Sequence, residues 1–240
     1  MLSQLSLKAT YKLESNMTFS IAGYCKKTGM VGSAITSSSI CVASRCAFAK
    51  SDVGVVLTQN VTNPALGPFG LEQLSSGATP EETLEKLKEH ETYIEYRQLG
   101  ILNAQGEGVT FSGENALGIY NEASGNACIA MGNLLDNSDV PAAMIASFES
   151  NEDLPLPQRL LSALQAGLDA GGEAGSVQSA GLQVYSNPSW PIVDLRVDWQ
   201  DAPLSELQIL LDMYEPQMND YILRAESPAH AASYGVPGDL

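Results

Sequence analysis

The pair Met17-Thr18 opens a β-prone stretch, Thr18–Tyr24 (TFSIAGY), and has the form of an N-terminal nucleophile. A threonine at the first position of a chain can attack a carbonyl with its hydroxyl while its own α-amino group takes the proton. That amino group has a pKa of about 7.7 to 8.0, so part of it is neutral near physiological pH. If translation begins at Met17, removal of one methionine exposes Thr18. If it begins at Met1, the chain must be cut between Met17 and Thr18.

The same chemistry favours a cation near the nucleophile. Lys50 lies 32 residues after Thr18, directly before the apolar run Val53–Leu57. The region resembles proteasome-type threonine hydrolases, which carry a lysine at this kind of separation. Arg45 is the nearby substitute, and the structural alternative for Lys50 is a solvated strand end.

Polar side chains that could complete the site follow several predicted strands. The run Thr58–Pro64 (TQNVTNP) leaves an apolar strand, so Gln59 or Asn60 could donate to a developing oxyanion. The alternative is a turn whose Asn side chains satisfy backbone groups. Asn133 offers a further amide donor, and Ser33, Ser37 or Ser38 could orient the nucleophile. The expected catalytic residues are Thr18, Lys50, Asn60 and Asn133, and the expected substrate-binding residues are Ser37, Arg45, Gln59, Asn63 and Ser179.

Other common catalytic and cofactor motifs lack support in the sequence. The only histidines, His90 and His230, stand in no motif that would build a Ser-His-Asp triad, and there is no GxSxG segment. No GxGxxG or GxxxxGK[ST] loop indicates a nucleotide cofactor. The four cysteines have no zinc-ligand spacing. We therefore expect neither a cofactor nor a metal.

The negative charge of the chain argues against polyanionic binding partners. A net charge of −16, from 28 acidic and 12 basic residues, opposes binding to nucleic acids and to anionic membranes. The sequence has no apolar run long enough for a transmembrane helix, and the first sixteen residues lack the apolar core of a secretory signal. We expect a cytoplasmic protein that acts on a small molecule, and base rates favour a homodimer.

The elements that must position these residues alternate between strands and pairs of helices, and they predict an α+β fold. Thr79-Pro80-Glu81-Glu82 has the pattern of a capping box that opens a helix. We predict one domain over residues 18–240, preceded by an extension over residues 1–17. The predicted strands are 18–24, 30–36, 53–57, 96–102, 108–112, 127–131, 177–185 and 192–197, and the predicted helices are 66–76, one opening at 79, 140–149, 157–170 and 204–214.

Several segments together are similar to one bacterial family. They are TFSIAGYCKKTGMVGSAITSSS, VGVVLTQNVTNPALGPFGLEQL, MGNLL, VQSAGLQV, VDLRVD and YGVPGD. The chain resembles domain-of-unknown-function family 1028, which is placed in the N-terminal-nucleophile hydrolase superfamily. The resemblance covers about residues 18–240.

The resemblance implies a four-layer αββα sandwich and amide hydrolysis, with Thr18 where the superfamily places its nucleophile. Two features depart from that pattern. A retained extension would block the amine of Thr18. Proteasome-like members also carry an acidic residue in the second-strand region, where this chain has Gly32-Ser33-Ala34.

Three hypotheses follow. The first is a hydrolase of a small amide or peptide-like C–N bond with Thr18 as nucleophile. The second is a non-catalytic protein of the same fold that binds a small ligand beside residues 58–63 or forms a homo-oligomer. The third is a hydrolase with an internal nucleophile, Ser20, Ser37 or Ser38, which would need a base that two histidines do not readily provide.

Overall fold

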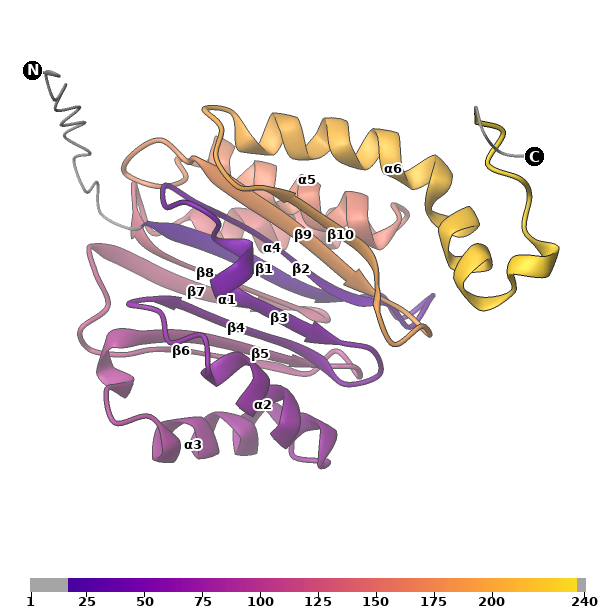
Figure 1. Ribbon diagram of the computed structural model, residues 1–240. Coiled ribbons are helices and arrows are strands. Elements are labelled where there is room, and N and C mark those ends of the chain that lie inside the picture. Colours follow the sequence, from indigo (N-terminus) through magenta and orange to yellow (C-terminus); the bar gives the residue numbers. More distant parts are fainter. Residues whose placement is uncertain (1–16, 237–240) are drawn as a thin grey trace, which may run out of the picture.

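The computed structural model describes residues 17–236 and contains two antiparallel β-sheets, shown in Figure 1. The six-stranded sheet has the order β10-β9-β2-β1-β8-β7 and the four-stranded sheet the order β3-β4-β5-β6. The strands are β1 Thr18–Tyr24, β2 Val31–Ser37, β3 Ala47–Lys50, β4 Gly54–Asn60, β5 Arg97–Asn103, β6 Gly108–Ser112, β7 Ile119–Gly125, β8 Cys128–Leu135, β9 Ser179–Tyr185 and β10 Pro191–Val197.

The helices are α1 Ala43–Cys46, α2 Leu66–Ser75, α3 Pro80–His90, α4 Val140–Ser150, α5 Leu156–Asp169 and α6 Pro203–Glu226, with short 3-10 turns η1 Ile94–Tyr96 and η2 Pro228–His230. Five of the helices cover the outer faces of the sheets, whereas the short helix α1 contributes Ala43 and Cys46 to the core between the sheets. Helices α4, α5 and α6 pack on the six-stranded sheet, whereas α2 and α3 pack on the four-stranded sheet. The fold is therefore a mixed α+β arrangement with two antiparallel sheets, and the α+β class agrees with the sequence prediction.

Side chains along β1 alternate between a face that packs on the helices and a face that packs on the second sheet. Phe19 and Ile21 point to the helices and belong to a core that includes Phe148 and Leu160. Ala22 points to the other sheet and belongs to a core shared with strands of both sheets. Because successive residues of a strand face opposite sides, Thr18 and Ser20 share the inter-sheet face with Ala22.

The structure confirms the predicted capping box of Thr79 and Glu82. The predicted strands 18–24 and 30–36 pair as the β1–β2 hairpin, and the predicted strands 177–185 and 192–197 pair as β9 and β10. Two strands extend further than predicted. β4 continues through Gln59 to Asn60, so these residues are strand rather than loop. β8 likewise continues past Asn133 to Leu135. β3 and β7 were not predicted.

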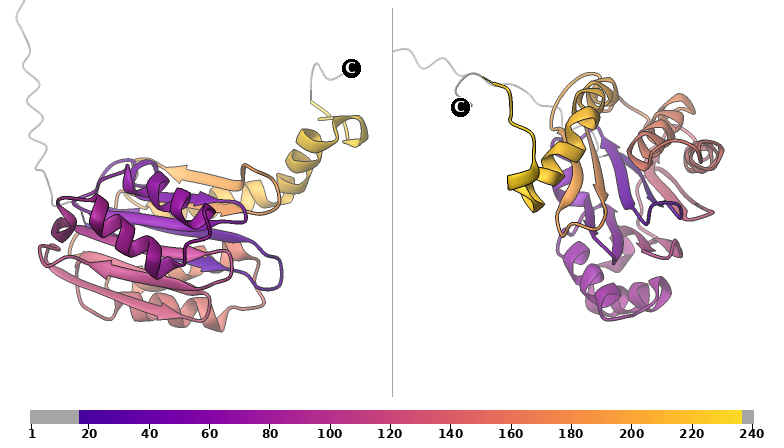
Figure 2. Two further views of the ribbon diagram at one scale, coloured as in Figure 1. Left: turned by 90° about the horizontal axis from the view of Figure 1, so that it is seen from below. Right: turned by 90° about the vertical axis from the view of Figure 1, so that its right-hand side faces the viewer.

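The last helix is the largest difference from the sequence prediction. Helix α6 does not end at Tyr214 but continues through Pro216 to Glu226. A proline inside a helix removes one backbone hydrogen bond and usually marks a boundary, so the sequence pattern ended there. Figure 2 shows the second half of α6 projecting beyond the strand ends. Among residues 17–236, no helix is long and apolar enough to cross a bilayer.

Candidate functional site

Four of the predicted site residues form one row across the six-stranded sheet. Ser179 of β9 pairs with Ser37 of β2, Ser37 pairs with Thr18 of β1, and Thr18 pairs with Asn133 of β8. Directly paired residues of antiparallel strands place their side chains on the same face, here the face toward the second sheet. All four are buried, and Thr18 is only 4% exposed.

The hydroxyl of Thr18 is linked to the carbonyl of the preceding residue through Ser37. Thr18 Oγ1 donates to Ser37 Oγ at 3.2 Å, and Ser37 Oγ donates to the carbonyl oxygen of Met17. The backbone N–H of Ser39 also donates to Ser37 Oγ at 3.0 Å. One serine thus holds both the candidate nucleophile and the carbonyl oxygen of the bond between Met17 and Thr18.

Arg45 supplies the positive charge at this site. Its Nη2 donates to Ser39 Oγ at 2.8 Å, its Nη1 donates to the carbonyl of Ile40, and Ser39 Oγ lies 2.8 Å from Ser37 Oγ. A serine has one hydroxyl proton, and Ser37 gives its proton to Met17. Ser39 must therefore donate to Ser37, and the chain of donors runs from the guanidinium to the Met17 carbonyl.

Lys50 is not brought to Thr18. It ends β3 opposite Gly54, whereas Gln59, five residues further along β4, is the residue that reaches the Thr18 carbonyl. Five residues of extended strand span roughly 17 Å. Lys50 is exposed and its Nζ bonds to Ser75 Oγ of α2, on the outer face of the sheet. Its position is that of the solvated strand end.

A cluster of buried amides lies beneath Thr18, between the two sheets. Ser20 Oγ donates to Gln59 Oε1 at 2.6 Å, and Gln59 Nε2 donates to Gln98 Oε1 at 2.7 Å. Asn133 Nδ2 also donates to Gln98 Oε1, at 3.1 Å. Asn133 Oδ1 is buried and has no hydrogen-bond partner among the described residues. The cluster fixes Asn133 beside Thr18 and places polar groups between the two sheets next to the candidate nucleophile.

Asn60 and Asn63 have structural partners instead. Asn60 has a left-handed backbone with φ of 69°, a conformation that Asn tolerates better than most residues. Its Nδ2 donates to the Tyr96 carbonyl at 2.7 Å and its Oδ1 accepts from the N–H of Leu117 at 3.1 Å. Asn63 Nδ2 donates to Glu91 Oε2 at 2.6 Å. Both side chains hold the segments around the end of β4.

The partner of Asn63 belongs to a buried ion pair that ties α3 to β5. Glu91 Oε2 lies 3.3 Å from Arg97 Nε, and both side chains are almost fully enclosed. Burial raises the pKa of Glu91, but hydrogen bonds from Asn63, the Tyr93 N–H and Arg97 outweigh it, and the pKa lies below its ordinary value. The stability contributed by this carboxylate is present above its ordinary pKa and is lost as the pH falls through the lowered value.

Replacement of Glu91 by alanine is therefore expected to lower the free energy of unfolding by about 3 to 5 kcal/mol, because Arg97 is left buried and unpaired. Urea unfolding at pH 7 measures the loss. Glu89→Ala, on the exposed face of the same helix, is the control and should change stability by less than about 0.5 kcal/mol. Equal stability of the two variants would show that the ion pair is not a structural anchor.

Three polar groups near Thr18 were not predicted from the sequence: Ser39, Gln98 and Glu173. Glu173 follows a Gly-Gly helix stop, is 5% exposed, and accepts the N–H of Ser38 at 3.0 Å. Burial raises the pKa of Glu173 to about 8, against the lowering effect of its hydrogen bonds with Ser38. Gln98 could not be predicted because the sequence does not show which face of β5 meets the other sheet. Glu173 could not be predicted because it stands in no motif.

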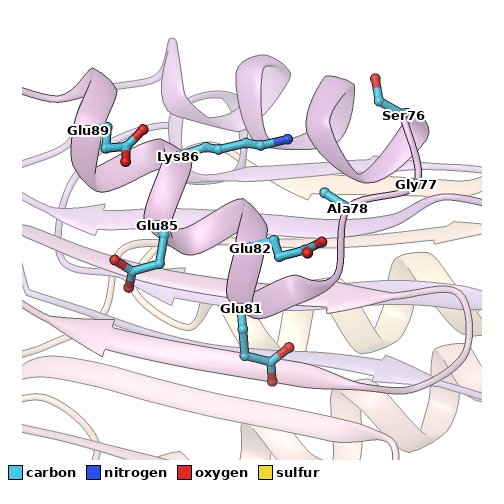
Figure 3. A pocket seen from close by; sticks show the side chains of 8 residues that line it. All are labelled: Ser76, Gly77, Ala78, Glu81, Glu82, Glu85, Lys86 and Glu89. Atoms are coloured by element: carbon cyan, nitrogen blue, oxygen red, sulfur yellow. The ribbon is translucent and has the colours of Figure 1, made fainter.

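A surface hollow lined by α3 and by the loop before it, shown in Figure 3, is unrelated to this site. It is lined mainly by charged side chains of the exposed face of α3: Glu81, Glu82, Glu85, Lys86 and Glu89. These groups lie on the outer side of the four-stranded sheet, whereas Thr18 faces the space between the sheets. Over residues 17–236 no three His, Cys, Asp or Glu side chains gather in a way that could hold a metal ion.

Comparison with known proteins identifies the family of this chain. A family model described as a family of unknown function, DUF1028, matches residues 18–207. The chain belongs to this family. It is also similar to a crystal structure of a DUF1028 protein from Silicibacter pomeroyi, with 27% sequence identity and a TM-score of 0.78, over 85% of this chain and 94% of that chain. No curated protein matches the chain.

Proposed function

We propose that this protein is an N-terminal-nucleophile hydrolase that cleaves a small amide or peptide-like C–N bond with Thr18. The observation that supports it most is the position of the Ser37 hydroxyl, which bonds both to Thr18 Oγ1 and to the carbonyl oxygen of the residue before it. A carbonyl at that position is next to a nucleophile and already accepts a hydrogen bond. The order of helices, sheet, sheet and helices agrees with the four-layer αββα sandwich of that superfamily.

In the proposed reaction, the free α-amino group of Thr18 takes the proton of Oγ1 as that oxygen bonds to the substrate carbonyl carbon. The negative charge that develops on the carbonyl oxygen is stabilised by Ser37, whose donor chain begins at the Arg45 guanidinium. The C–N bond breaks, and the leaving nitrogen receives the proton. Water then hydrolyses the ester, which releases the acid and restores the Thr18 hydroxyl.

This assignment redistributes the roles expected from the sequence. Arg45 takes the place of Lys50 as the cation, and Ser37 with Asn133 takes the place of Asn60 at the oxyanion. Gln59 and Ser179 position the neighbouring strands, since Ser179 Oγ donates to the Ser39 carbonyl at 2.6 Å. An internal nucleophile is disfavoured because Ser20 is fully buried and donates to Gln59.

The reaction needs a chain that begins at Thr18, and either initiation at Met17 with removal of that methionine or cleavage after Met17 would provide one. A non-catalytic binding protein of the same fold is the second candidate. The burial of Met17, which is only 5% exposed, favours this second candidate, because a retained Met17 blocks the α-amine of Thr18. We also propose a cytoplasmic location and a homodimer; the four free cysteines agree with a reducing compartment.

The test compares the 240-residue chain with one released from a fusion partner so that Thr18 is its first residue. Both are treated with a β-lactone, which acylates activated hydroxyls, and are examined by intact mass and peptide mapping. We expect one acyl group, on Thr18, in the shorter chain alone. Equal labelling of both chains, or labelling at another residue, would refute Thr18 as the nucleophile.

The shorter chain is a suitable enzyme preparation. The family match begins at residue 18, and the strands and helices described over residues 17–236 begin with β1 at Thr18. A thermal melt of both chains checks that the fold is retained.

A further inference from the structure

Three parts of Met17, its carbonyl oxygen, its backbone N–H and its side chain, each contact the protein, as the parts of a bound acyl group would. Its carbonyl oxygen accepts from Ser37 Oγ, and its backbone N–H donates to Ser38 Oγ at 3.2 Å. Its side chain lies over Gly175, where an added Cβ would stand 2.5 Å from the terminal methyl carbon of Met17. The carbonyl, the nitrogen and the side chain of this one residue therefore each have a defined place beside Thr18 Oγ1.

A carboxyl group stands behind the place of the Met17 nitrogen. Glu173 Oε2 accepts the backbone N–H of Ser38 at 3.0 Å, and the hydroxyl of Ser38 also hydrogen-bonds to this carboxyl group. The other oxygen, Oε1, is buried and has no hydrogen-bond partner among residues 17–236. No described lysine or arginine forms an ion pair with Glu173. One hydroxyl thus separates the Met17 nitrogen from an uncompensated carboxyl group.

We propose that the space filled by Met17 is the acyl subsite of the Thr18 hydrolase, and that it takes α-aminoacyl groups with a free amine and an unbranched apolar side chain. Ser38 and Glu173 position the amine, and Gly175 leaves room for the side chain. This proposal rests on the proposed function, because it names the substrate class of the same site.

The chemistry of the amine explains the choice of substrate. An ammonium group has three protons where the peptide N–H of Met17 has one. One proton would replace the bond to Ser38 Oγ, and another is available to the unpartnered Glu173 oxygen. Burial makes the ionised form of this carboxyl group costly, and a positively charged group at this position would offset that cost and allow the carboxylate to form. With Met17 in this space, burial raises the pKa of Glu173 to about 8, which agrees with a carboxyl group that has no cation beside it among the described residues.

The side-chain subsite selects by shape. Gly175 has no Cβ, and an alanine there would overlap the end of a methionine-like side chain while leaving a short side chain untouched. No positive φ constrains this glycine, so Gly175→Ala is a mild change to the backbone. The variant thus separates long from short acyl groups.

The experiment measures kcat/KM of the chain that begins at Thr18 on the 4-nitroanilides of methionine, norleucine, alanine and N-acetylmethionine. We expect the free-amine methionyl and norleucyl substrates to exceed the N-acetylated one by about tenfold or more, the range of a charge-assisted hydrogen bond. Glu173→Gln should remove this preference and leave the N-acetylated substrate unchanged. Gly175→Ala should slow the methionyl substrate by about tenfold and spare the alanyl one. Glu215→Gln, on α6, is the matched control.

A binding measurement separates this proposal from the hydrolase itself. Calorimetric titration of methioninamide and N-acetylmethioninamide into the Thr18→Ala form of the same chain reports the subsite without catalysis. Preferential binding of methioninamide that Glu173→Gln abolishes would support the subsite even if no anilide is cleaved. Cleavage of anilides with no preference for a free amine, and equal binding of the two amides, would overturn the subsite and leave the hydrolase standing. Absence of both cleavage and binding would overturn both.

Discussion

Replacement of Thr18 by alanine, in a chain that begins at residue 18, is expected to reduce amide hydrolysis by about 10⁴-fold or more, the scale on which removing a nucleophile acts. Thr18→Ser keeps both the hydroxyl and the α-amine and should retain measurable turnover. The rates are measured with saturating methionyl 4-nitroanilide, so that a change in binding does not hide the loss of chemistry.

Thr28→Ala is the control for this comparison, since Thr28 is exposed in the turn after β1. It should leave the rate unchanged. If Thr18→Ala has the rate of the unmodified chain, the nucleophile is another residue. If the 240-residue chain retains Met17 and hydrolyses the substrate equally fast, a free amine at Thr18 is not the base.

Replacement of Glu173 by glutamine is expected to stabilise the 240-residue protein at alkaline pH. The ordinary pKa of this carboxyl group is 4.5, and burial raises it to about 8 in the folded state. The folded state therefore binds more protons than the unfolded state between these values, and the wild type loses stability as the pH rises through this window. At 1.36 kcal/mol for each pKa unit, the loss reaches up to about 5 kcal/mol by pH 9.

Glutamine stays neutral throughout, so the variant should match the wild type near pH 4.5 and exceed its stability at pH 9. Urea unfolding at pH 5, 7 and 9 measures the difference, with Glu215→Gln as the control for a glutamate on α6. Parallel stability curves for the wild type and Glu173→Gln would show that burial does not raise the pKa of this carboxyl group in the folded state, and would contradict the prediction.

The residue types in the site could be predicted, but their arrangement could not. Thr18 was identifiable because it starts the first strand, and Ser37, Asn133 and Ser179 because they are polar residues near strand ends. That they form one row depends on the register of β9 against β2, which joins residues far apart in the sequence. The local pattern indicates which residues of a strand share a face, but it does not indicate which strands far apart in the sequence pair with each other.

Lys50 and Asn60 show why spacing alone misplaces a side chain. The separation of Lys50 from Thr18 suits a threonine hydrolase, but the short β3 runs antiparallel to β4 and carries Lys50 away from Gln59. The sequence predicts Asn60 as an amide donor, but the left-handed backbone at the end of β4 gives this residue a conformational role. Glu173 is the reverse case: the sequence does not mark it as a site residue, and it becomes a candidate only because the fold buries its carboxyl group near Thr18.

The place of Thr18 in β1 has a consequence for the entropy of the proposed reaction. The first residues of most domains fray, and a nucleophile on a loose end would have to be ordered each time a substrate binds. Here Thr18 is paired on both sides, with Ser37 and with Asn133, and β1 lies in the interior of a six-stranded sheet. The conformational entropy of Thr18 is lost once, when the sheet forms. In the proposed reaction each turnover would therefore begin with a preorganised nucleophile.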